Sequence, residues 1–549
     1  AETTGVFQLE SRGMRDYLRQ LVPSDFEDIV SMNALYRPGA LGMNMVDSYI
    51  NRKHGREEVT YGHEAVEKIL STTYGVIVYQ EQVMQIAQDL SGFSLGQADI
   101  LRRAMGKKKK EEMERLRSTF IEGAVKKKVN ERYAANLFDQ IEQFAGYGFN
   151  RSHSVGYALI AYQTAWLKAH FPSEFMASVM SCDLGNTDSI QLFVDDCRNI
   201  GLNILKPDIN KSSYRFEDIN SSTILYGLGA IKGIGESLVD KIVEEREKKE
   251  YKDLLDFCIR VGFNRVNKRI LMALIGSGAM DCLGKRNYLF NIVESCLRNS
   301  EQAAERDKSN IKDFFGDEVS VGIVEDESLQ DIEFDHVSAE WGALGFYLES
   351  HPLESRKKEV RHMCGFFISE LQAESHPQRI AGTLVHLNVR QGKRGRFAFA
   401  TLDDSSGRIE VSIWAEIFDN YRNLLKKGQL LVVEGIVDRD EYGDKKSYKI
   451  IADKILTFEQ ARREYVKNIS IQIDNKFDED SVIKVIKELA ISDEGNKVLI
   501  SYEAEEASAE IELPQDYLID LKDENIKLLK NTFGKDNINL VYHSRPHLN

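Results

Sequence analysis

Apolar side chains recur at helical spacing through the first part of the chain. The clearest run covers residues 80–105, and Gly106 follows where a left-handed glycine would end a helix. Residues 157–170 show the same period and stop before Pro172, a residue that rarely lies inside a helix. Because residues 7–61 also follow this period with short polar interruptions, we expect a mainly helical N-terminal region.

From residue 379 to residue 458 the period changes to two, which is typical of strands with one buried face. The strand candidates are residues 383–389, 396–402, 408–414, 429–437 and 447–451. A helix-like stretch at 415–425 separates the third candidate from the fourth, which is the element order of an OB-fold barrel. The tail from residue 467 reads as β-α-β and then further helix. The pattern predicts a multidomain α+β protein with helical, OB-barrel and small α/β parts.

Residues 303–333 interrupt these patterned regions with an acidic, sparsely apolar stretch that predicts a linker or an exposed arm. Within it, Asp313, Phe314 and Phe315 follow Ile311. Neighbouring polar residues cannot bury two adjacent phenylalanines, so these rings either dock into a partner or pack back on their own domain.

Composition narrows the class of protein. The net charge of -15 argues against a uniformly basic nucleic-acid coat, although it leaves room for local basic patches. The six cysteines stand singly, without metal-ligand spacing, and read as reduced residues of a cytoplasmic protein. We find no signal peptide and no apolar run that would span a bilayer, so no membrane partner is expected. The chain begins without Met, as though an upstream part were missing.

The first candidate site is a basic cluster. Arg102 and Arg103 close one predicted helix, and Lys107 and Lys108 begin a lysine run that opens the next. Cations at a helix start are repelled by the positive end of the helix dipole. A bound anion, such as a triphosphate or a nucleic-acid backbone, would offset this repulsion. The alternative is a solvated face whose lysines pair with acids four residues later, and charge alone leaves both open.

A second cluster stands at another predicted helix start. Asn150, Arg151 and His153 follow a glycine-rich aromatic loop, and Ser152 or Ser154 is the expected N-cap. Bases could stack on the nearby rings, or the loop could be a capped turn with its aromatic residues in the core. No His, Cys or carboxylate cluster surrounds His153, which argues against a metal site.

Two further features indicate nucleic-acid binding. Gly233 and Gly235 lie between apolar segments, a spacing that favours a helix-hairpin-helix over a plain turn. Its glycines would let backbone N–H groups reach a DNA phosphate. Lys393, Arg394 and Arg396 lie on an early strand pair of the predicted barrel, where OB-folds grip single strands.

Several short motifs follow one another along most of the chain. They are Thr4-Gly-Val-Phe-Gln-Leu-Glu-Ser-Arg-Gly-Met14, Tyr36-Arg-Pro-Gly39, Arg52-Lys-His-Gly55, Tyr79-Gln-Glu-Gln-Val-Met-Gln-Ile-Ala87, Leu101-Arg-Arg-Ala-Met-Gly-Lys-Lys108, Phe144-Ala-Gly-Tyr-Gly-Phe-Asn150, Ser152-His-Ser154 and Gly345-Phe-Tyr-Leu-Glu-Ser-His-Pro352. In this order they resemble the signatures of the α subunit of bacterial DNA polymerase III, the C-family replicative polymerase.

The resemblance implies a domain layout and roles. It implies fingers at residues 1–205, a helix-hairpin-helix DNA-binding region at 206–300, a linker with a clamp-binding arm at 301–376, an OB-fold domain at 377–460 and a domain that binds the clamp-loader τ subunit at 461–549. In that family an arginine pair of the fingers holds the incoming triphosphate, which implies this role for Arg102 and Arg103, with Lys107 and Lys108 as helpers. Primer-template and single-stranded DNA, dNTP, the β sliding clamp and τ are the implied partners.

The chain also departs from the family pattern. The family's palm aspartates, which hold two Mg²⁺ ions, lie upstream of the motif that begins here at Phe7, so the palm and PHP domains are expected to be missing. This chain alone is therefore predicted to bind no cofactor and to be inactive, while Mg²⁺ and a proofreading exonuclease subunit belong to the complete polymerase. Ile311 replaces the usual glutamine of the clamp motif, which predicts weakened clamp binding.

Two other functions stay open at this stage. The same folds would suit a stand-alone, non-catalytic DNA-binding scaffold. The error-prone paralogue of the same polymerase family is the other alternative, and the position of the τ-type tail speaks against it.

Overall fold

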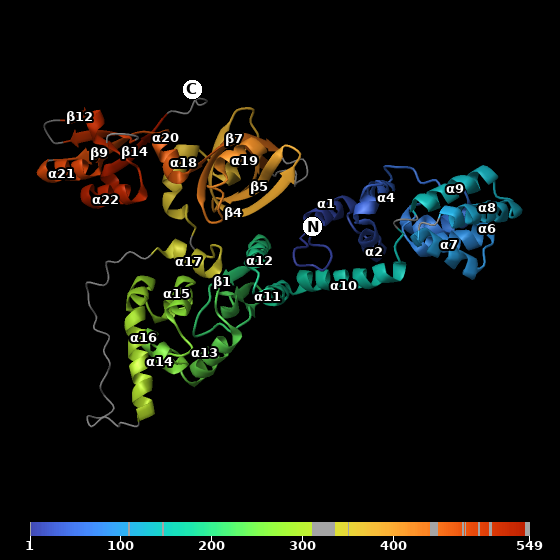
Figure 1. Ribbon diagram of the computed structural model, residues 1–549, viewed down its shortest axis with the longest axis horizontal. Coiled ribbons are helices and arrows are strands. Elements are labelled where there is room, and N and C mark those ends of the chain that lie inside the picture. Colours follow the sequence, from blue (N-terminus) through green and yellow to red (C-terminus); the bar gives the residue numbers. More distant parts are fainter. Residues whose placement is uncertain are drawn as a thin grey trace. The chain divides into compact units, whose positions relative to one another are not determined.

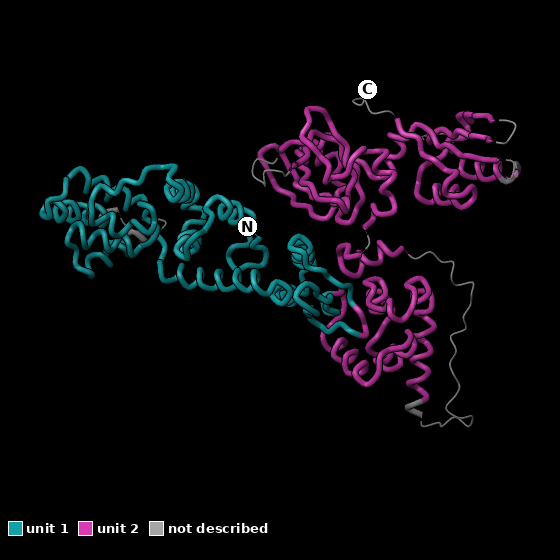
Figure 2. The backbone as a smooth tube through the Cα atoms, turned by 180° about the vertical axis from the view of Figure 1, so that it is seen from behind, with its two compact units in different colours: residues 1–207, 211–230 teal, residues 208–210, 231–549 magenta. Residues whose placement is uncertain are grey.

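The structure is a computed structural model, which describes residues 2–107, 110–144, 148–309, 335–349, 351–439, 448–474, 477, 479–491, 495–503 and 508–543. Two compact units divide the chain (Figure 2). Unit 1 comprises residues 1–207 and 211–230, and unit 2 comprises residues 208–210 and 231–549. No described helix is both long enough and apolar enough to cross a bilayer.

Unit 1 is mainly helical, as predicted (Figure 1). Its α-helices are α1 (Arg12–Leu21), α2 (Phe26–Leu35), α3 (Pro38–Leu41), α4 (Met45–Lys53), α5 (Glu64–Leu70), α6 (Gln80–Ser91), α7 (Leu95–Lys107), α8 (Lys110–Lys126), α9 (Glu131–Phe144), α10 (Arg151–His170), α11 (Pro172–Cys182) and α12 (Thr187–Asn199). One apolar core gathers α1, α2, α4 and α10, and a second gathers α5 to α9. A small sheet has the order β1 (Asn203–Leu205), β3 (Thr223–Leu225), β2 (Glu217–Asn220).

The predicted helix at residues 80–105 is two helices, and the second ends at Lys107, one residue after the predicted stop at Gly106. Gly92, with φ +73°, ends α6, and the N–H of Phe93 donates to the carbonyl of Ala87 at 3.1 Å. This left-handed glycine with a bond back to the previous turn is a Schellman ending. Ser94 then opens α7, which runs through Gly106.

In unit 2 the helices come first. They are α13 (Glu236–Lys248), α14 (Leu254–Val261), α15 (Lys268–Gly276), α16 (Arg286–Ser309) and α17 (His336–Leu344). The helix α16 continues to Ser309 and so includes the first residues of the predicted acidic arm at 303–333. Residues 310–334 lie outside the described residues.

The barrel prediction is confirmed. The strands β4 (Gln378–Gly392), β5 (Gly395–Asp403), β6 (Arg408–Ile413), β7 (Leu430–Arg439) and β8 (Tyr448–Thr457) close in the order β4-β5-β6-β8-β7. The helix α19 (Ala415–Tyr421) lies between β6 and β7, and alternate strand residues fill one apolar core. This closure leaves the barrel without a free sheet edge.

The tail is a small α/β domain, as predicted. Strands β9 (Val466–Ile473) and β11 (Lys497–Glu503) pair in parallel across α21 (Glu479–Leu489). The sheet order is β12 (Ser508–Glu512), β11, β9, β14 (Ile538–Tyr542). The helix α22 (Asp523–Phe533) covers it, and β10 (Ala490–Ile491) pairs with β13 (Leu518–Ile519). The whole chain is thus a multidomain α+β protein.

A buried arginine joins the barrel to this tail. Arg462 lies in α20 (Phe458–Tyr465), and its side chain is only 3 % exposed. It forms a two-point pair with Glu359 of α18 (Lys357–Cys364) and donates to Asp523 at 2.5 Å. Burial alone would raise the pKa of Asp523, but the charges of Arg462 and Arg356 outweigh it and hold this pKa below its ordinary value. One guanidinium therefore ties three helices together.

Arg462→Met tests this joint. Removing the cation leaves two carboxylates without their shared partner, so we expect the free energy of unfolding to fall by about 3 kcal/mol or more. Urea unfolding followed by Trp414 fluorescence measures it. Lys497→Met is the control, because the Lys497–Glu512 pair has both side chains more than half exposed. Lys497→Met should lower the free energy of unfolding by less than about 1 kcal/mol. Equal losses in the two variants would contradict the role of Arg462.

Candidate nucleotide and nucleic-acid interface

Arg102 and Arg103 lie on the outer side of α7, and one carboxylate holds both. Nε and Nη2 of Arg102 donate to Oδ1 of Asp99 at 3.0 and 2.8 Å. Nη2 of Arg103 lies 2.7 Å from Oδ2 of the same carboxylate. On the side of the helix away from Asp99, Leu101 and Ala104 are buried and fix its rotation. The two guanidiniums thus form a positioned pair.

This pair stays accessible to an anion. The arginine side chains are 37 % and 67 % exposed, and each guanidinium carries five N–H donors. The hydrogen bond from Arg102 and the charge of Arg103 hold the pKa of Asp99 below its ordinary value, so this carboxylate stays ionised at neutral pH. Lys107 ends α7 and Lys108 lies outside the described residues, so their helper role stays a prediction.

The second cluster gathers at the start of α10. Oδ1 of Asn150 accepts the N–H of His153 at 2.9 Å, while Nδ2 of Asn150 donates to Glu81 at 2.9 Å. Glu81 also accepts the backbone N–H of Arg151 at 3.0 Å, and Nη2 of Arg151 donates to Glu27 at 2.8 Å. Two carboxylates, from α6 and α2, therefore hold Asn150 and Arg151 at the start of α10, and Asn150 in turn binds the backbone of His153.

The predicted caps Ser152 and Ser154 are wrong. The helix begins at Arg151, ahead of both serines, and Asn150 is its N-cap. Ser154 is fully buried, and its hydroxyl donates to the carbonyl of Val30 at 2.6 Å. Asn150 is the better cap because its amide caps α10 and binds Glu81 at the same time.

Aromatic rings surround this cluster. The His153 ring lies between Phe149 and Tyr157, with centroid distances of 5.6 and 4.5 Å. The guanidinium of Arg37 lies 4.3 Å from the centroid of Phe149. Phe149 packs against the core, whereas His153 is exposed and Tyr157 is 37 % exposed. The cluster therefore has exposed rings on which a base could stack, and it is also a capped turn with one ring, Phe149, packed against the core.

The carboxylates that organise both clusters were not predicted. Asp99 stands three and four residues before its partners on one helix, and this spacing could have revealed it. Glu81 and Glu27 lie 69 and 124 residues from their partners, and the local sequence carries no signal for such pairs.

The glycine hairpin leads into α13. Gly233 has φ +84°, which favours glycine, whereas Gly235 is the extended N-cap of α13 with φ -96°. A Cβ atom on either residue would meet nothing within 4 Å. The turn therefore presents open backbone at a helix start, a suitable place for a phosphate.

The basic residues of the barrel occupy one hairpin. Lys393 and Arg394 form the two-residue turn between β4 and β5, and Arg396 follows on β5. All three are exposed. Aromatic residues lie on the same strands: the guanidinium of Arg390 lies 5.5 Å from the Phe399 ring, and Phe397 lies 5.8 Å from Trp414, which is 52 % exposed. Cations beside exposed rings suit a single strand.

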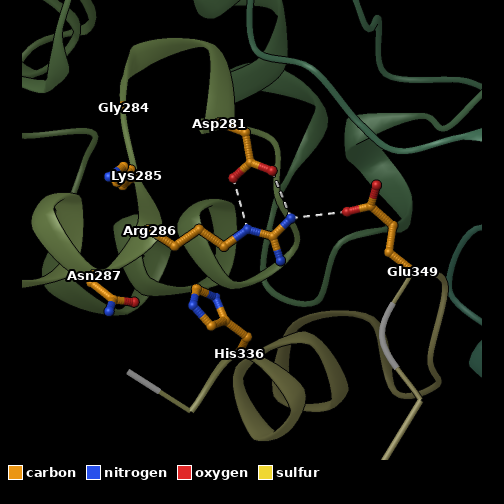
Figure 3. A pocket seen from close by; sticks show the side chains of 7 residues that line it. All are labelled: Asp281, Gly284, Lys285, Arg286, Asn287, His336 and Glu349. Carbon is orange, nitrogen blue, oxygen red and sulfur yellow. Dashed lines mark hydrogen bonds and ion pairs between the residues drawn. The ribbon is translucent and has the colours of Figure 1, made fainter. Parts of the chain in front are cut away.

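A pocket in unit 2 takes no part in these clusters (Figure 3). Asp281, Gly284, Lys285, Arg286, Asn287, His336 and Glu349 line it. Arg286 is 9 % exposed. It donates two hydrogen bonds of 2.7 Å to Asp281 and one of 3.0 Å to Glu349. This ion-pair network, in which only Arg286 is buried, lies at the start of α16.

The predicted clamp motif cannot be placed. Asp313, Phe314 and Phe315 lie outside the described residues. Among the described residues, no group of three or more His, Cys, Asp or Glu side chains could hold a metal ion.

Comparisons with protein families match three parts of the chain. Residues 1–128 match the bacterial DNA polymerase III alpha subunit finger domain. Residues 201–289 match a helix-hairpin-helix motif, and residues 379–457 match an OB-fold nucleic acid binding domain. The last match coincides with the closed barrel.

Similar proteins extend this result to nearly the whole chain. DNA polymerase III subunit alpha of Pseudomonas aeruginosa is 40 % identical over 99 % of this chain. The same subunit of Escherichia coli K12 is 40 % identical, and that of Vibrio cholerae is 41 % identical, each again over 99 % of this chain. The chain belongs to the bacterial DNA polymerase III α-subunit family. It spans 48 % of the length of each of these curated relatives.

In this member of the polymerase III α-subunit family, the matched finger region holds only part of the site. Asp99, Arg102 and Arg103 lie within residues 1–128, as does Glu81. Asn150 lies beyond this match but is bound to Glu81. The second cluster is therefore anchored to the finger region by a side-chain contact.

Replacing Lys393, Arg394 and Arg396 together by Ala should weaken binding of single-stranded DNA. Because each phosphate contact on a single strand contributes about 0.7 to the salt slope, the slope should fall by about 2. Fluorescence anisotropy with labelled oligonucleotides at several salt concentrations measures this.

The matched control for this variant removes three exposed cations that lie away from the β4–β5 hairpin. Arg422, Lys426 and Lys427 lie in and before the turn that meets β4 near Leu384. An equal loss in both triple variants would mean that net charge, not the hairpin, determines binding.

Gly235→Val should weaken duplex binding without disturbing the fold, because its φ suits any residue and the space beside it is open. Loss of one phosphate contact lowers the salt slope by about 1. Gly185→Val is the control, since Gly185 lies in a turn and a Cβ atom on it would also meet nothing within 4 Å. An unchanged slope in Gly235→Val would refute the phosphate contact.

Proposed function

We propose that this chain is part of a bacterial replicative DNA-directed DNA polymerase. Its role is to bind the phosphates of the incoming dNTP and the primer-template during chromosomal replication. The observation that carries the proposal is the 40 % identity to a DNA polymerase III subunit alpha along 99 % of the chain. The pair Arg102–Arg103, held by Asp99 on an exposed helix face, is the best triphosphate site that the geometry offers.

The other DNA contacts fall on three places. The cluster of Asn150, Arg151 and His153 contacts DNA near the nucleotide, and the hairpin at Gly233 and Gly235 contacts the duplex backbone. The β4–β5 hairpin holds single-stranded template. Basic side chains beside aromatic rings, and open backbone N–H groups at a helix start, support these assignments.

The remaining partners rest on the family membership. The β sliding clamp would bind the arm containing Asp313, Phe314 and Phe315, the τ subunit would bind residues 461–549, and the setting would be cytoplasmic. The described residues offer no carboxylate cluster that fits Mg²⁺, so we assign no step of nucleotidyl transfer to them. The metal would belong to other parts of the complete polymerase.

Replacing Arg102 and Arg103 together by Ala tests the nucleotide site. In the complete polymerase that contains these residues, the KM for dNTP should rise about tenfold or more, because the triphosphate loses its guanidinium donors. Primer-extension kinetics at varied dNTP concentration measures this.

Arg117→Ala is the control for that variant. Arg117 pairs with Asp139, and its side chain is 38 % exposed, close to the 37 % of Arg102. The control should leave the KM unchanged. Wild-type KM values in the double variant would remove Arg102 and Arg103 from the site.

A further inference from the structure

The helix α10 has apolar side chains on the side that faces away from its own unit. Figure 1 shows α10 as a long helix with α2 along one side of it. Three small residues face α2 and are fully buried: Ser154, Ala158 and Ala161. With 3.6 residues per turn, Leu159 and Trp166 project from the opposite side. An ordinary surface helix would carry charged residues there.

We define the α10 outer face by the residues of this opposite side. They are Gly156, Leu159, Ile160, Gln163, Trp166 and Leu167. The four large apolar side chains among them are 43 % to 47 % exposed. Residues 155–167 contain no Asp, Glu, Lys, Arg or His. A contiguous apolar face of this kind is typical of a protein contact, and without cations it does not suit a phosphate backbone.

The start of the chain runs along the same helix. Nζ of Lys168 donates to the carbonyl of Thr4 at 2.8 Å, and the N–H of Phe7 donates to Oγ1 of Thr164 at 3.2 Å. The ring of Phe7 lies 5.5 Å from that of Tyr157. In a longer chain, residues that precede these would therefore emerge beside α10.

We propose that the α10 outer face is the docking surface for the part of the polymerase that the relatives have and this sequence lacks. The relatives are about twice as long as the matched region, since this chain spans 48 % of them. The start of α10 carries Asn150, Arg151 and His153, so a partner seated on α10 lies next to this cluster. The proposal rests on the proposed function, because it treats the chain as part of a longer polymerase.

Site-specific photo-crosslinking tests the proposal in the complete polymerase chain. The photo-reactive amino acid p-benzoylphenylalanine replaces Leu159, which is 47 % exposed, or, as the control, Val125 of α8, which is 46 % exposed. After illumination, mass spectrometry should find crosslinks from position 159 to peptides outside these 549 residues. Position 125 should give none of them. Crosslinks from 159 to DNA or to a second, isotope-labelled copy, or a pattern equal to that of the control, would overturn the proposal.

A polar variant gives a second readout. Leu159→Gln with Ile160→Gln and Trp166→Gln should lower the melting temperature of the complete chain by several degrees. The same changes should leave the 549-residue chain as stable as before, because water already covers this face there. Equal shifts in both chains would contradict the docking role.

Primer extension by the same complete chains separates the two proposals. Extension together with control-like crosslinking would overturn the docking surface and leave the polymerase function standing. Specific crosslinking from position 159 in a complete chain that neither binds nor incorporates dNTP would overturn the function and leave the docking surface standing.

Discussion

A cation that binds a phosphate must stay accessible from water and yet keep its position. In the candidate site of this chain, carboxylates hold the arginine side chains in position while leaving them exposed. Asp99 holds the two guanidiniums of Arg102 and Arg103 on an open helix face. Glu27 and Glu81 do the same for Arg151 and the backbone that follows Asn150. Since an exposed arginine otherwise samples many rotamers, such partners reduce the entropy lost when a phosphate binds. The candidate site depends on this arrangement.

The scaffold keeps these carboxylates in place through packing. Leu101 and Ala104 are buried on the inner side of α7, so Asp99 and its arginines point outward. The small buried residues of α10 let it approach α2 closely, which brings Glu27 of α2 within reach of Arg151. In unit 2, the buried Arg462 joins the barrel to the tail in a comparable way, through carboxylates on two other helices.

Local patterns predicted much of the fold. The period of two and the element order gave the barrel, and the β-α-β spacing of the tail proved correct. An error arose at Gly92, which ends a helix inside a run predicted to be continuous, because Phe93 bonds back to Ala87. The partners of Asn150 and Arg151 could not be predicted, since Glu81 and Glu27 approach them only through the packing of α6 and α2. Both arginine clusters were predicted from their own sequence, whereas the residues that position the second one required the fold.

Primer extension by this chain alone tests the central claim most directly. The assay supplies a primed template, Mg²⁺ and all four dNTPs, and binding of the same DNA is measured by anisotropy. Our account predicts that the DNA binds and that no nucleotide is incorporated, because we propose that the metal site for nucleotidyl transfer belongs to another part of the polymerase. Incorporation would contradict it, since these residues would then contain a complete catalytic site. Absence of DNA binding would contradict it as well.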